Sequence, residues 1–312
     1  MKILVLGAAG FIGTNLVTKL LEDKENRITL FDRDGTDFSY FEQNYKEQIK
    51  VVTGNYCNLS DFKPIVSDSD VVYHLISVGN PSTSNKNILG DIENNIPASS
   101  KLFDACVECK VKKVVFLSSG GTVYGNTDII PIPETAPTNP ISTYGFQKLI
   151  IEKMLALYGH MYGLNYNIIR LANPYGPHQN PLGNQGIVTI FAYKAIRGEP
   201  ITVYGKGDTV RDYIFIDDVV KGIIKISDNA KTGIYNLGSG EGKSINDIIK
   251  AIEETLNVSI EINHIDTRGV DADKNVLDMT KYNLSLGKDN ITTLHDGISK
   301  TVEFLKKKYD LR

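Results

Sequence analysis

The sequence has few cysteines, little net charge and no long apolar run, and each shortage excludes a class of protein. Its three cysteines, Cys57, Cys106 and Cys109, are too few for a disulfide framework, so we expect a reducing, cytoplasmic location. Cys106 and Cys109 lie three residues apart within a helical pattern, where they share one face of the helix. Because no second pair is present, helix packing is favoured and no metal site is expected.

The charges are nearly balanced, with 34 basic and 37 acidic residues and a net charge of −3. No basic face follows the chain, so nucleic acid is not an expected partner. No stretch approaches the roughly 18 consecutive apolar residues of a membrane-spanning helix, so no membrane association is expected. With 312 residues, of which 41% are hydrophobic, the chain is long enough for one large or two modest globular domains.

Short apolar runs alternate with helical patterns in the first half of the chain. Several runs are continuously apolar, as strands buried on both faces should be. The expected strands are residues 2–7, 27–32, 50–55, 71–77, 112–119 and 166–173. The expected helices between them are residues 13–23, 89–109 and 142–163. This order predicts an α/β fold with a doubly wound parallel sheet of the Rossmann type and helices on both faces.

The composition changes after residue 172. A loop rich in Pro, Gly and Asn leads to an expected helix at 187–197, and shorter strand-like segments follow. We therefore predict a first domain over residues 1–172 and a smaller C-terminal α/β domain over 173–312. Segments near 212–236 are expected to return to the first domain.

A glycine-rich turn follows the first expected strand. The segment GAAGFIG places Gly7, Gly10 and Gly13 directly before a helix. Gly7 permits the tight turn, Gly10 lets backbone N–H groups approach a pyrophosphate, and Gly13 allows the helix to pack closely on the strand. The next strand ends in Asp32, whose carboxylate can accept hydrogen bonds from both ribose hydroxyls and repels a 2′-phosphate. The pattern predicts dinucleotide binding by the first domain and favours NAD over NADP, although Arg33 follows Asp32 directly.

A second glycine cluster, GSGEGKS at residues 238–244, resembles a phosphate-binding loop in composition. The phosphate-loop spacing would require a glycine where Leu237 stands. We therefore predict a turn in which Ser244 is the N-cap of a helix and Asp247 lies in the first helical turn.

Tyr144 and Lys148 lie four residues apart in a helical pattern and therefore on one face of the helix. A tyrosine with a pKa near ~10 is a poor base at neutral pH. An ammonium about 5 Å away stabilises the phenolate by roughly 3 kcal/mol, which is about two pKa units. With a dinucleotide turn and a Ser/Thr cluster in the same chain, the pair is predicted to remove a proton from a sugar hydroxyl.

The ordered set of motifs resembles the extended short-chain dehydrogenase/reductase family, and most closely its nucleotide-sugar 4-epimerases of the UDP-glucose 4-epimerase type. The resemblance covers nearly the whole chain and is carried, in the family's order, by MKILVLGAAGFIG, VVYHLIS, SSGGTVYG, YGFQK, IIRLANPYGP, GEPITVYGKGDTVRDYIFIDDVV and YNLGSGEGKSI. It implies an NAD-dependent epimerase that inverts C4 of a nucleotide sugar, UDP-glucose/UDP-galactose or their N-acetyl forms, through a 4-keto intermediate. It also implies a homodimer formed through two helices.

The resemblance further implies roles for individual residues. The NAD contacts would come from Gly7, Gly10, Phe11, Ile12, Gly13, Asp32, Asn55, Tyr56, Leu75, Asn95, Ser118, Tyr144 and Lys148. The nucleotide diphosphate would be held by Asn173, Tyr204, Arg211, Tyr213, Arg268 and Asp271. Arginine suits that task because its planar fork matches phosphate oxygens.

The segment SSGGTVYG departs from the family pattern. The family usually has Ser or Thr where this chain has Gly120, and that hydroxyl bonds the substrate oxygen beside the tyrosine. Thr122 is the preferred substitute, and Ser119 or a bridging water are alternatives. Dehydratases and decarboxylases of this superfamily carry acidic residues at the positions of Gly121 and Thr122, so plain oxidation and reduction at C4 is favoured here.

Two other functions stay open on the sequence alone. The nearest is a nucleotide-sugar 4-ketoreductase or 4,6-dehydratase, which would release a changed product. The second is a non-catalytic NAD-binding protein, which the glycine at position 120 favours and the intact Tyr144 and Lys148 disfavour.

Overall fold

The structure is a computed structural model that describes residues 1–79, 84–266 and 274–311. The chain forms two compact units. The first unit consists of Met1–Gly125, Pro137–Arg170 and Ile223–Tyr235, and the second of Asn126–Ala136, Leu171–Gly222 and Asn236–Arg312.

The division of the chain differs from the predicted domains in two segments. Residues 126–136 belong to the second unit, because the backbone of Ile132 is hydrogen-bonded to Val276 and Asp278 at 2.8 and 2.9 Å. Of the segment near 212–236, only Ile223–Tyr235 belongs to the first unit. The change of unit after Arg170 lies two residues from the predicted boundary at 172.

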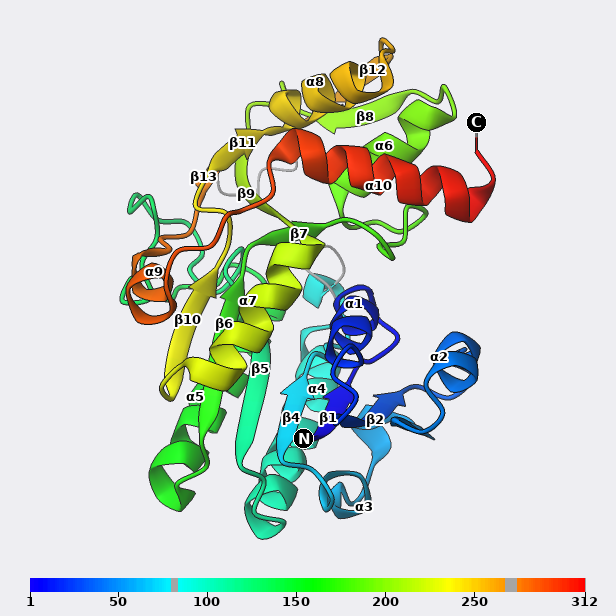
Figure 1. Cartoon of the computed structure of the whole chain (residues 1–312). Coiled ribbons are helices and arrows are strands. Elements are labelled where there is room, and N and C mark those ends of the chain that lie inside the picture. The colour runs from blue at the N-terminus through cyan, green and yellow to red at the C-terminus, as the bar shows by residue number, and fades with distance from the viewer. Residues whose placement is uncertain (80–83, 267–273, 312) are drawn as a thin grey trace. The chain divides into compact units, whose positions relative to one another are not determined.

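A seven-stranded sheet with the order β10-β6-β5-β4-β1-β2-β3 organises the first unit (Figure 1). Its strands are β1 (Lys2–Leu6), β2 (Arg27–Asp32), β3 (Ile49–Thr53), β4 (Val71–His74), β5 (Lys113–Ser119), β6 (Tyr166–Leu171) and β10 (Gly233–Leu237). The strands β3, β2, β1, β4 and β5 pair in parallel, and the direction of winding reverses between β1 and β4. Cofactor sites in such sheets lie at that reversal, beyond the carboxyl ends of the strands. The predicted doubly wound fold is confirmed.

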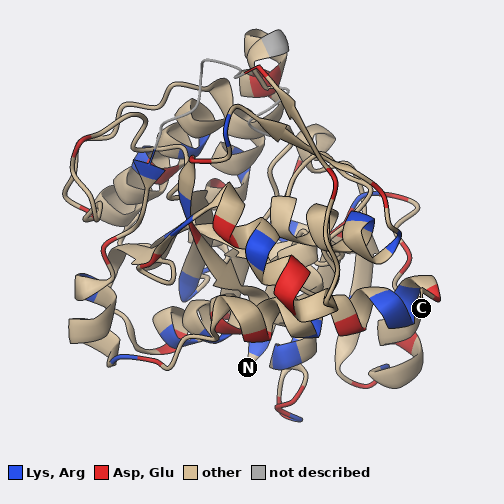
Figure 2. Cartoon of the chain, turned by 90° about the horizontal axis from the view of Figure 1, so that it is seen from above, with Lys and Arg blue, Asp and Glu red and all other residues tan. Residues whose placement is uncertain are grey.

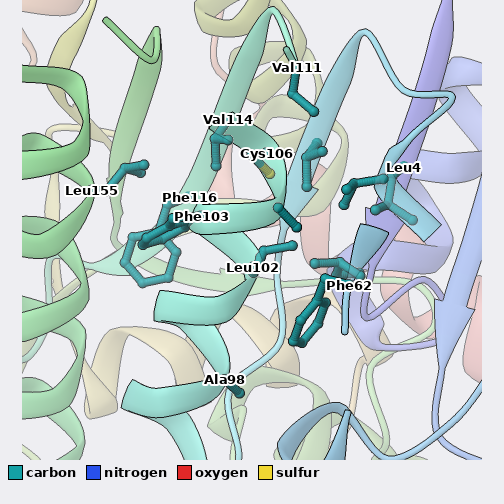
Figure 3. Packing of buried hydrophobic residues seen from close by; sticks show 14 of the residues in the cluster. Leu4, Phe62, Ala98, Leu102, Phe103, Cys106, Val111, Val114, Phe116 and Leu155 are labelled. Atoms are coloured by element: carbon teal, nitrogen blue, oxygen red, sulfur yellow. The ribbon is translucent and has the colours of Figure 1, made fainter. Parts of the chain in front are cut away.

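Helices cover both faces of this sheet. They are α1 (Phe11–Leu20), α2 (Ser39–Asn44), α3 (Lys63–Val66), α4 (Ile88–Glu108), α5 (Thr143–Tyr162) and α7 (Ile216–Asn229), with short 3-10 turns at Tyr56–Asn58 and Ser84–Lys86. One face packs against α3, α4 and α5 in an apolar core that includes Val114, Phe116 and Leu102 (Figure 3). Tyr73 points to the opposite face, where its hydroxyl is hydrogen-bonded to Ser227 of α7.

The second unit is a smaller α/β arrangement. Its strands are β7 (Asn173–Tyr175), β8 (Ile201–Tyr204), β9 (Val210–Phe215), β11 (Gly242–Ser244), β12 (Ile262–Ile265) and β13 (Lys274–Asn275). Its helices are α6 (Ile187–Ile196), α8 (Ile245–Leu256), α9 (Thr280–Leu286) and α10 (Leu294–Tyr309). β9 pairs with β7, β11 and β13, while α6, α8 and α10 pack against one another.

Acidic and basic residues are interspersed on the elements seen in Figure 2. A membrane-spanning helix, which would have to be both long and apolar, is not found among the described residues.

Candidate active site

The glycine turn after β1 packs so closely against α1 that side chains larger than glycine would not fit. Gly7 has a φ of +88°, which glycine adopts without strain. A Cβ on Gly13 would lie 2.0 Å from the carbonyl oxygen of Gly7, so only glycine lets α1 approach the turn. Gly10 is the N-cap of α1 and provides no side chain to cap the first-turn N–H groups, as an anion-binding helix start requires. Phe11 and Ile12, both half-buried, follow in that first turn.

Asp32 ties the end of β2 to the glycine turn. One carboxylate oxygen accepts the N–H of Ala9 at 3.0 Å, and the other accepts the N–H of Arg33 at 2.9 Å. Each carboxylate oxygen has more than one lone pair, so both can still accept a ribose hydroxyl. The turn and the carboxylate together fit a dinucleotide without a 2′-phosphate.

Asn55 and Tyr56, both expected among the NAD contacts, differ in the exposure of their side chains. Asn55 is exposed and caps the short turn that follows β3, accepting the N–H of Cys57 at 3.0 Å. The side chain of Tyr56 is buried, and its hydroxyl lies 3.0 Å from His74 Nε2 and 3.1 Å from Ser99 Oγ. Any contact of Tyr56 with a cofactor would therefore come from its backbone.

Leu75 lies in the loop that leaves β4, and Asn95 lies on α4 and bonds to that loop. The N–H of Leu75 donates to Leu6 O at 3.0 Å, which places this loop beside the glycine turn. The buried Asn95 side chain accepts from Val78 N at 2.9 Å and donates to Val78 O and to Gln147 Oε1, both at 2.8 Å. Asn95 thus fastens the loop after β4 to α5 rather than presenting a free amide.

Lys148 is buried beneath Tyr144 on α5. Its Nζ donates to the carbonyl oxygen of Leu117 at 2.7 Å and lies 4.8 Å from the centre of the Phe116 ring and 5.8 Å from that of Tyr144. The side chain of Tyr144 is half-buried and is hydrogen-bonded to Ser77 in the loop after β4. The structure therefore brings the predicted pair together.

The predicted lowering of the Tyr144 pKa is wrong for the protein by itself. Burial raises the pKa of Tyr144 to about 12, with the hydrogen bond to Ser77 acting in the opposite direction. Burial also lowers the pKa of Lys148 to about 7, against the attraction of Glu152. At neutral pH the ammonium is thus only partly charged, and its effect on the phenol is correspondingly weak.

The start of α5 is fixed by side chains from the loop before α4. The backbone N–H groups of Thr143 and Tyr144 donate to Asn85 Oδ1 and Ser84 Oγ at 2.8 and 3.1 Å. The N-cap residue Ser142 accepts the N–H of Gly145 at 3.2 Å. These bonds satisfy N–H groups that a helix start leaves free and hold the backbone of Tyr144 in place.

The hydroxyl cluster after β5 includes a buried side chain that has no partner among the described residues. Thr122 Oγ1 is buried and makes no hydrogen bond to the described residues. Ser119 is half-buried, and its carbonyl oxygen accepts the N–H groups of Thr122 and Val123 at 3.4 and 3.2 Å. Since a buried hydroxyl without a partner is costly, Thr122 is the member of the cluster best placed to bond a substrate oxygen.

Ser118 is occupied within the protein. Its hydroxyl donates to Glu152, and Glu152 forms an ion pair with Arg170 at 2.7 Å whose two side chains are 1% and 2% exposed. The guanidinium of Arg170 stacks on Tyr124, 4.8 Å from the ring centre. Sequence reasoning missed this group, although two signals mark it. Glu152 follows Lys148 by four residues, and Arg170 is a charged residue in a strand whose other residues carry no charge.

The strand β9 presents two of the predicted phosphate-binding residues on one face. Arg211 and Tyr213 alternate with Asp212, which is fully buried. Asp212 accepts Ser239 N at 2.8 Å, Gly240 N at 3.2 Å and Leu277 N at 3.3 Å. This carboxylate, which sequence reasoning also missed, holds the loop after β10 against β9.

The other predicted substrate residues are placed less completely. Asn173 donates its amide to Asp212 O at 3.1 Å, and Tyr204 is 40% exposed at the end of β8. Arg268 and Asp271 lie outside the described residues.

The second glycine cluster is a turn and a short strand that lead into α8. Ser244 is the N-cap of that helix, and Asp247 bonds back to it in a reciprocal capping box. The prediction of a helix cap in place of a phosphate loop is confirmed.

A glycine turn at the reversal of a doubly wound sheet, with a Tyr–Lys pair on a helix beside it, defines a short-chain dehydrogenase/reductase of the extended type. The sequence profile of the NAD-dependent epimerase/dehydratase family matches residues 3–238, and the chain belongs to that family.

Three known proteins show the extent of the likeness. A UDP-glucose 4-epimerase of Mycolicibacterium smegmatis is 33% identical over 316 residues, which cover 99% of both chains. A dTDP-4-dehydro-6-deoxyglucose reductase of Escherichia coli is 30% identical, over 97% of both chains. The crystal structure of a UDP-glucose 4-epimerase from Thermotoga maritima with UDP-glucose superposes with a TM-score of 0.92 at 33% identity, covering 99% of this chain and 100% of that one.

Proposed function

We propose that the protein is an NAD-dependent 4-epimerase of a UDP-hexose, with UDP-glucose and UDP-galactose or their N-acetyl forms as substrates. The observation that carries this proposal is the Tyr144–Lys148 pair, with the unpartnered hydroxyl of Thr122 contributed by the neighbouring strand end. The full-length similarity to UDP-glucose 4-epimerases supports the same substrate class.

The cofactor would be held by residues of the first unit. The N–H groups of the glycine turn suit the pyrophosphate, and Asp32 suits the ribose hydroxyls. When bound, NAD would supply the hydride-accepting and hydride-donating chemistry that inversion at C4 of the sugar requires.

Tyr144, Lys148 and Thr122 would carry out the transfer of the proton of the C4 hydroxyl. The phenolate oxygen of Tyr144 takes the proton of the C4 hydroxyl as C4 is oxidised to a ketone, and it gives that proton back when C4 is reduced. The ammonium of Lys148 stabilises the phenolate in between. Thr122 Oγ1 hydrogen-bonds the sugar oxygen and takes the part of the hydroxyl that Gly120 lacks.

The nucleotide would be held by the second unit. Arg211 and Tyr213 stand on one face of β9, and the amide of Asn173 is fixed beside that strand. A tight hold on the diphosphate with few contacts to the sugar leaves the 4-keto ring free to turn over, as inversion requires.

The test is product analysis with the purified protein and its Tyr144→Phe variant. The native protein is expected to interconvert UDP-glucose and UDP-galactose, or their N-acetyl forms, without added cofactor turnover. Loss of the phenolic oxygen should lower kcat by roughly 10²–10⁴-fold while NAD stays bound. Full turnover by the variant would remove Tyr144 as the base.

A second candidate is a nucleotide-sugar 4-ketoreductase. It is favoured by the glycine at position 120 together with the 30% identity to a dTDP-4-dehydro-6-deoxyglucose reductase. A reductase would consume reduced cofactor in proportion to product when offered a 4-keto sugar nucleotide, whereas an epimerase would not.

We also propose that the protein is a cytoplasmic homodimer formed through α4 and α5. These two helices pack side by side, and α5 carries Phe146, Leu157 and Met161 at helical spacing, 46%, 52% and 57% exposed. An apolar stripe of this kind on a surface helix is suited to a second copy of the same helix pair.

A further inference from the structure

The buried ion pair of Glu152 and Arg170 lies directly below the catalytic helix face. Glu152 follows Lys148 by one helical turn on α5, so both side chains point to the sheet. Both bind the same strand: Lys148 donates to Leu117 O at 2.7 Å, and Glu152 accepts from Ser118 in the next position of β5. The carboxylate is also gripped by Arg170 of β6 through three contacts of 2.7 to 3.3 Å.

Glu152 thus acts on two buried positive groups, on Arg170 through a direct ion pair and on Lys148 through electrostatic attraction along the helix. The guanidinium of Arg170 stays protonated in proteins. Its positive charge therefore offsets part of the stabilisation that the Glu152 carboxylate gives to the ammonium of Lys148. The exposed fractions of 1% for Glu152, 2% for Arg170 and 4% for Lys148 leave little room for water to screen them. Charge on Lys148 therefore depends on Glu152 far more than on surface carboxylates.

We propose that Glu152 is a positioning residue of the reaction, whose buried carboxylate keeps the side chain of Lys148 charged and aligned beside Tyr144. This inference rests on the proposed roles of Tyr144 and Lys148 and extends them to a residue that touches neither substrate nor cofactor. A purely structural role, in which the ion pair only joins α5 to β6, is the alternative that the test must exclude.

The groups that face Lys148 support an electrostatic role. On α5 they are Tyr144 and Glu152, on β5 the Leu117 carbonyl and the Phe116 ring, and on β4 the imidazole of His74. Burial lowers the pKa of His74 to about 3, so this side chain is neutral in the range where Lys148 titrates. Glu152 is thus the anionic group acting on Lys148 among these neighbours.

The test measures the titration of Lys148 directly, in the full chain. Protein containing lysine labelled with ¹³C at Cε is titrated by NMR, and the Lys148 signal is assigned by its loss in Lys148→Met. Glu152→Gln keeps the shape of the side chain and removes its charge, so the titration midpoint of Lys148 should fall by about one unit or more. Arg170→Met removes the competing positive charge, so the midpoint should rise.

Activity provides the second readout. Because a fall of one pKa unit lowers the population of the charged amine by up to tenfold at a pH above the midpoint, kcat of Glu152→Gln should fall by up to about tenfold there. The alkaline limb of its pH–kcat profile, where the ammonium of Lys148 is lost, should move to lower pH, and Glu152→Asp should restore part of both. Ser118→Ala is the matched control, since it removes a hydrogen bond to Glu152 without changing any charge, and its midpoint should stay near that of the native protein.

The two variants decide between an electrostatic and a structural role, because the Lys148 midpoint should fall in Glu152→Gln and rise in Arg170→Met. Equal losses of kcat in Glu152→Gln and Arg170→Met, with the Lys148 midpoint unmoved in both, would show a structural pair and overturn the inference. If Arg170→Met does not fold, Glu152→Gln against Ser118→Ala still decides, because only the charge change should move the midpoint. Absence of 4-inversion by the native protein would instead count against the proposed function, and the NMR midpoints would remain a separate result.

Discussion

The buried hydroxyl of Thr122 destabilises the free protein because it lacks a hydrogen bond to the described residues, and a bound substrate would provide that bond. It is buried without a partner among the described residues, so Thr122→Val should leave the free energy of unfolding unchanged or raise it by about 1 kcal/mol. The same substitution removes a hydrogen bond to the sugar oxygen and should lower kcat by roughly 3–10-fold. Urea denaturation and steady-state kinetics measure the two effects.

Ser119→Ala is the control for Thr122→Val. It removes the neighbouring hydroxyl and is expected to leave kcat within about twofold of the native value, because Thr122 rather than Ser119 is assigned to the substrate. A larger loss in Ser119→Ala than in Thr122→Val would reverse that assignment.

The buried imidazole of His74 makes stability depend on pH. Burial, with a smaller contribution from Lys148, lowers its pKa from 6.5 to about 3. Between these values the unfolded chain binds a proton that the folded protein does not, so the free energy of unfolding should fall as the pH is lowered. One proton corresponds to about 1.4 kcal/mol per pH unit. In denaturation experiments across this pH window, the free energy of unfolding of His74→Gln should depend less steeply on pH than that of the native protein, by the equivalent of up to one proton.

The exposed His160 supplies the comparison, since His160→Gln removes a histidine without removing a buried one. An acid slope that is the same in His74→Gln as in the native protein would mean that the imidazole is already charged in the fold.

At the scale of elements, the strand ends that carry the site follow from local sequence. Glycine turns, polar residues after apolar runs and the Ser244 cap are local signals, and the structure has them where they were expected. The expected strand at 71–77 ends earlier, at His74, because the loop after it is held by Asn95 and not by a neighbouring strand.

The features that sequence reasoning missed depend on contacts between segments that are distant in the chain. Residues 126–136 join the second unit through Ile132 and Leu277, which are 145 positions apart and show no shared pattern. The bond network of Asp212 and the pair of Glu152 with Arg170 are of the same kind. Burial of a charge becomes visible only when its partners are placed around it.

Asp212 should be the most sensitive position in the second unit. Asp212→Asn replaces one acceptor oxygen by a donor that faces the N–H groups of Ser239, Gly240 and Leu277. We expect a loss of roughly 2–4 kcal/mol in the free energy of unfolding, measured in urea. Asp217→Asn, at an exposed neighbouring position, should change stability by less than about 0.5 kcal/mol.

At the scale of the whole molecule, the apolar stripe on α5 should set the oligomeric state. Leu157→Glu puts a charge in the centre of the stripe and is expected to convert a dimer to a monomer, as measured by light scattering coupled to gel filtration. Leu284→Glu, at a residue that is 83% exposed on α9, should leave the mass unchanged. A native protein that is already monomeric would contradict the proposed interface.

The two bonds that Asp32 makes inside the protein have a consequence for engineering. Its carboxylate secures the glycine turn through Ala9 while it selects against a phosphorylated ribose. Replacing it to admit NADP would therefore also loosen the loop on which either cofactor rests. A change of cofactor preference in this scaffold should demand a second substitution that ties the turn down again, and variants altered at this position alone should lose affinity for both dinucleotides.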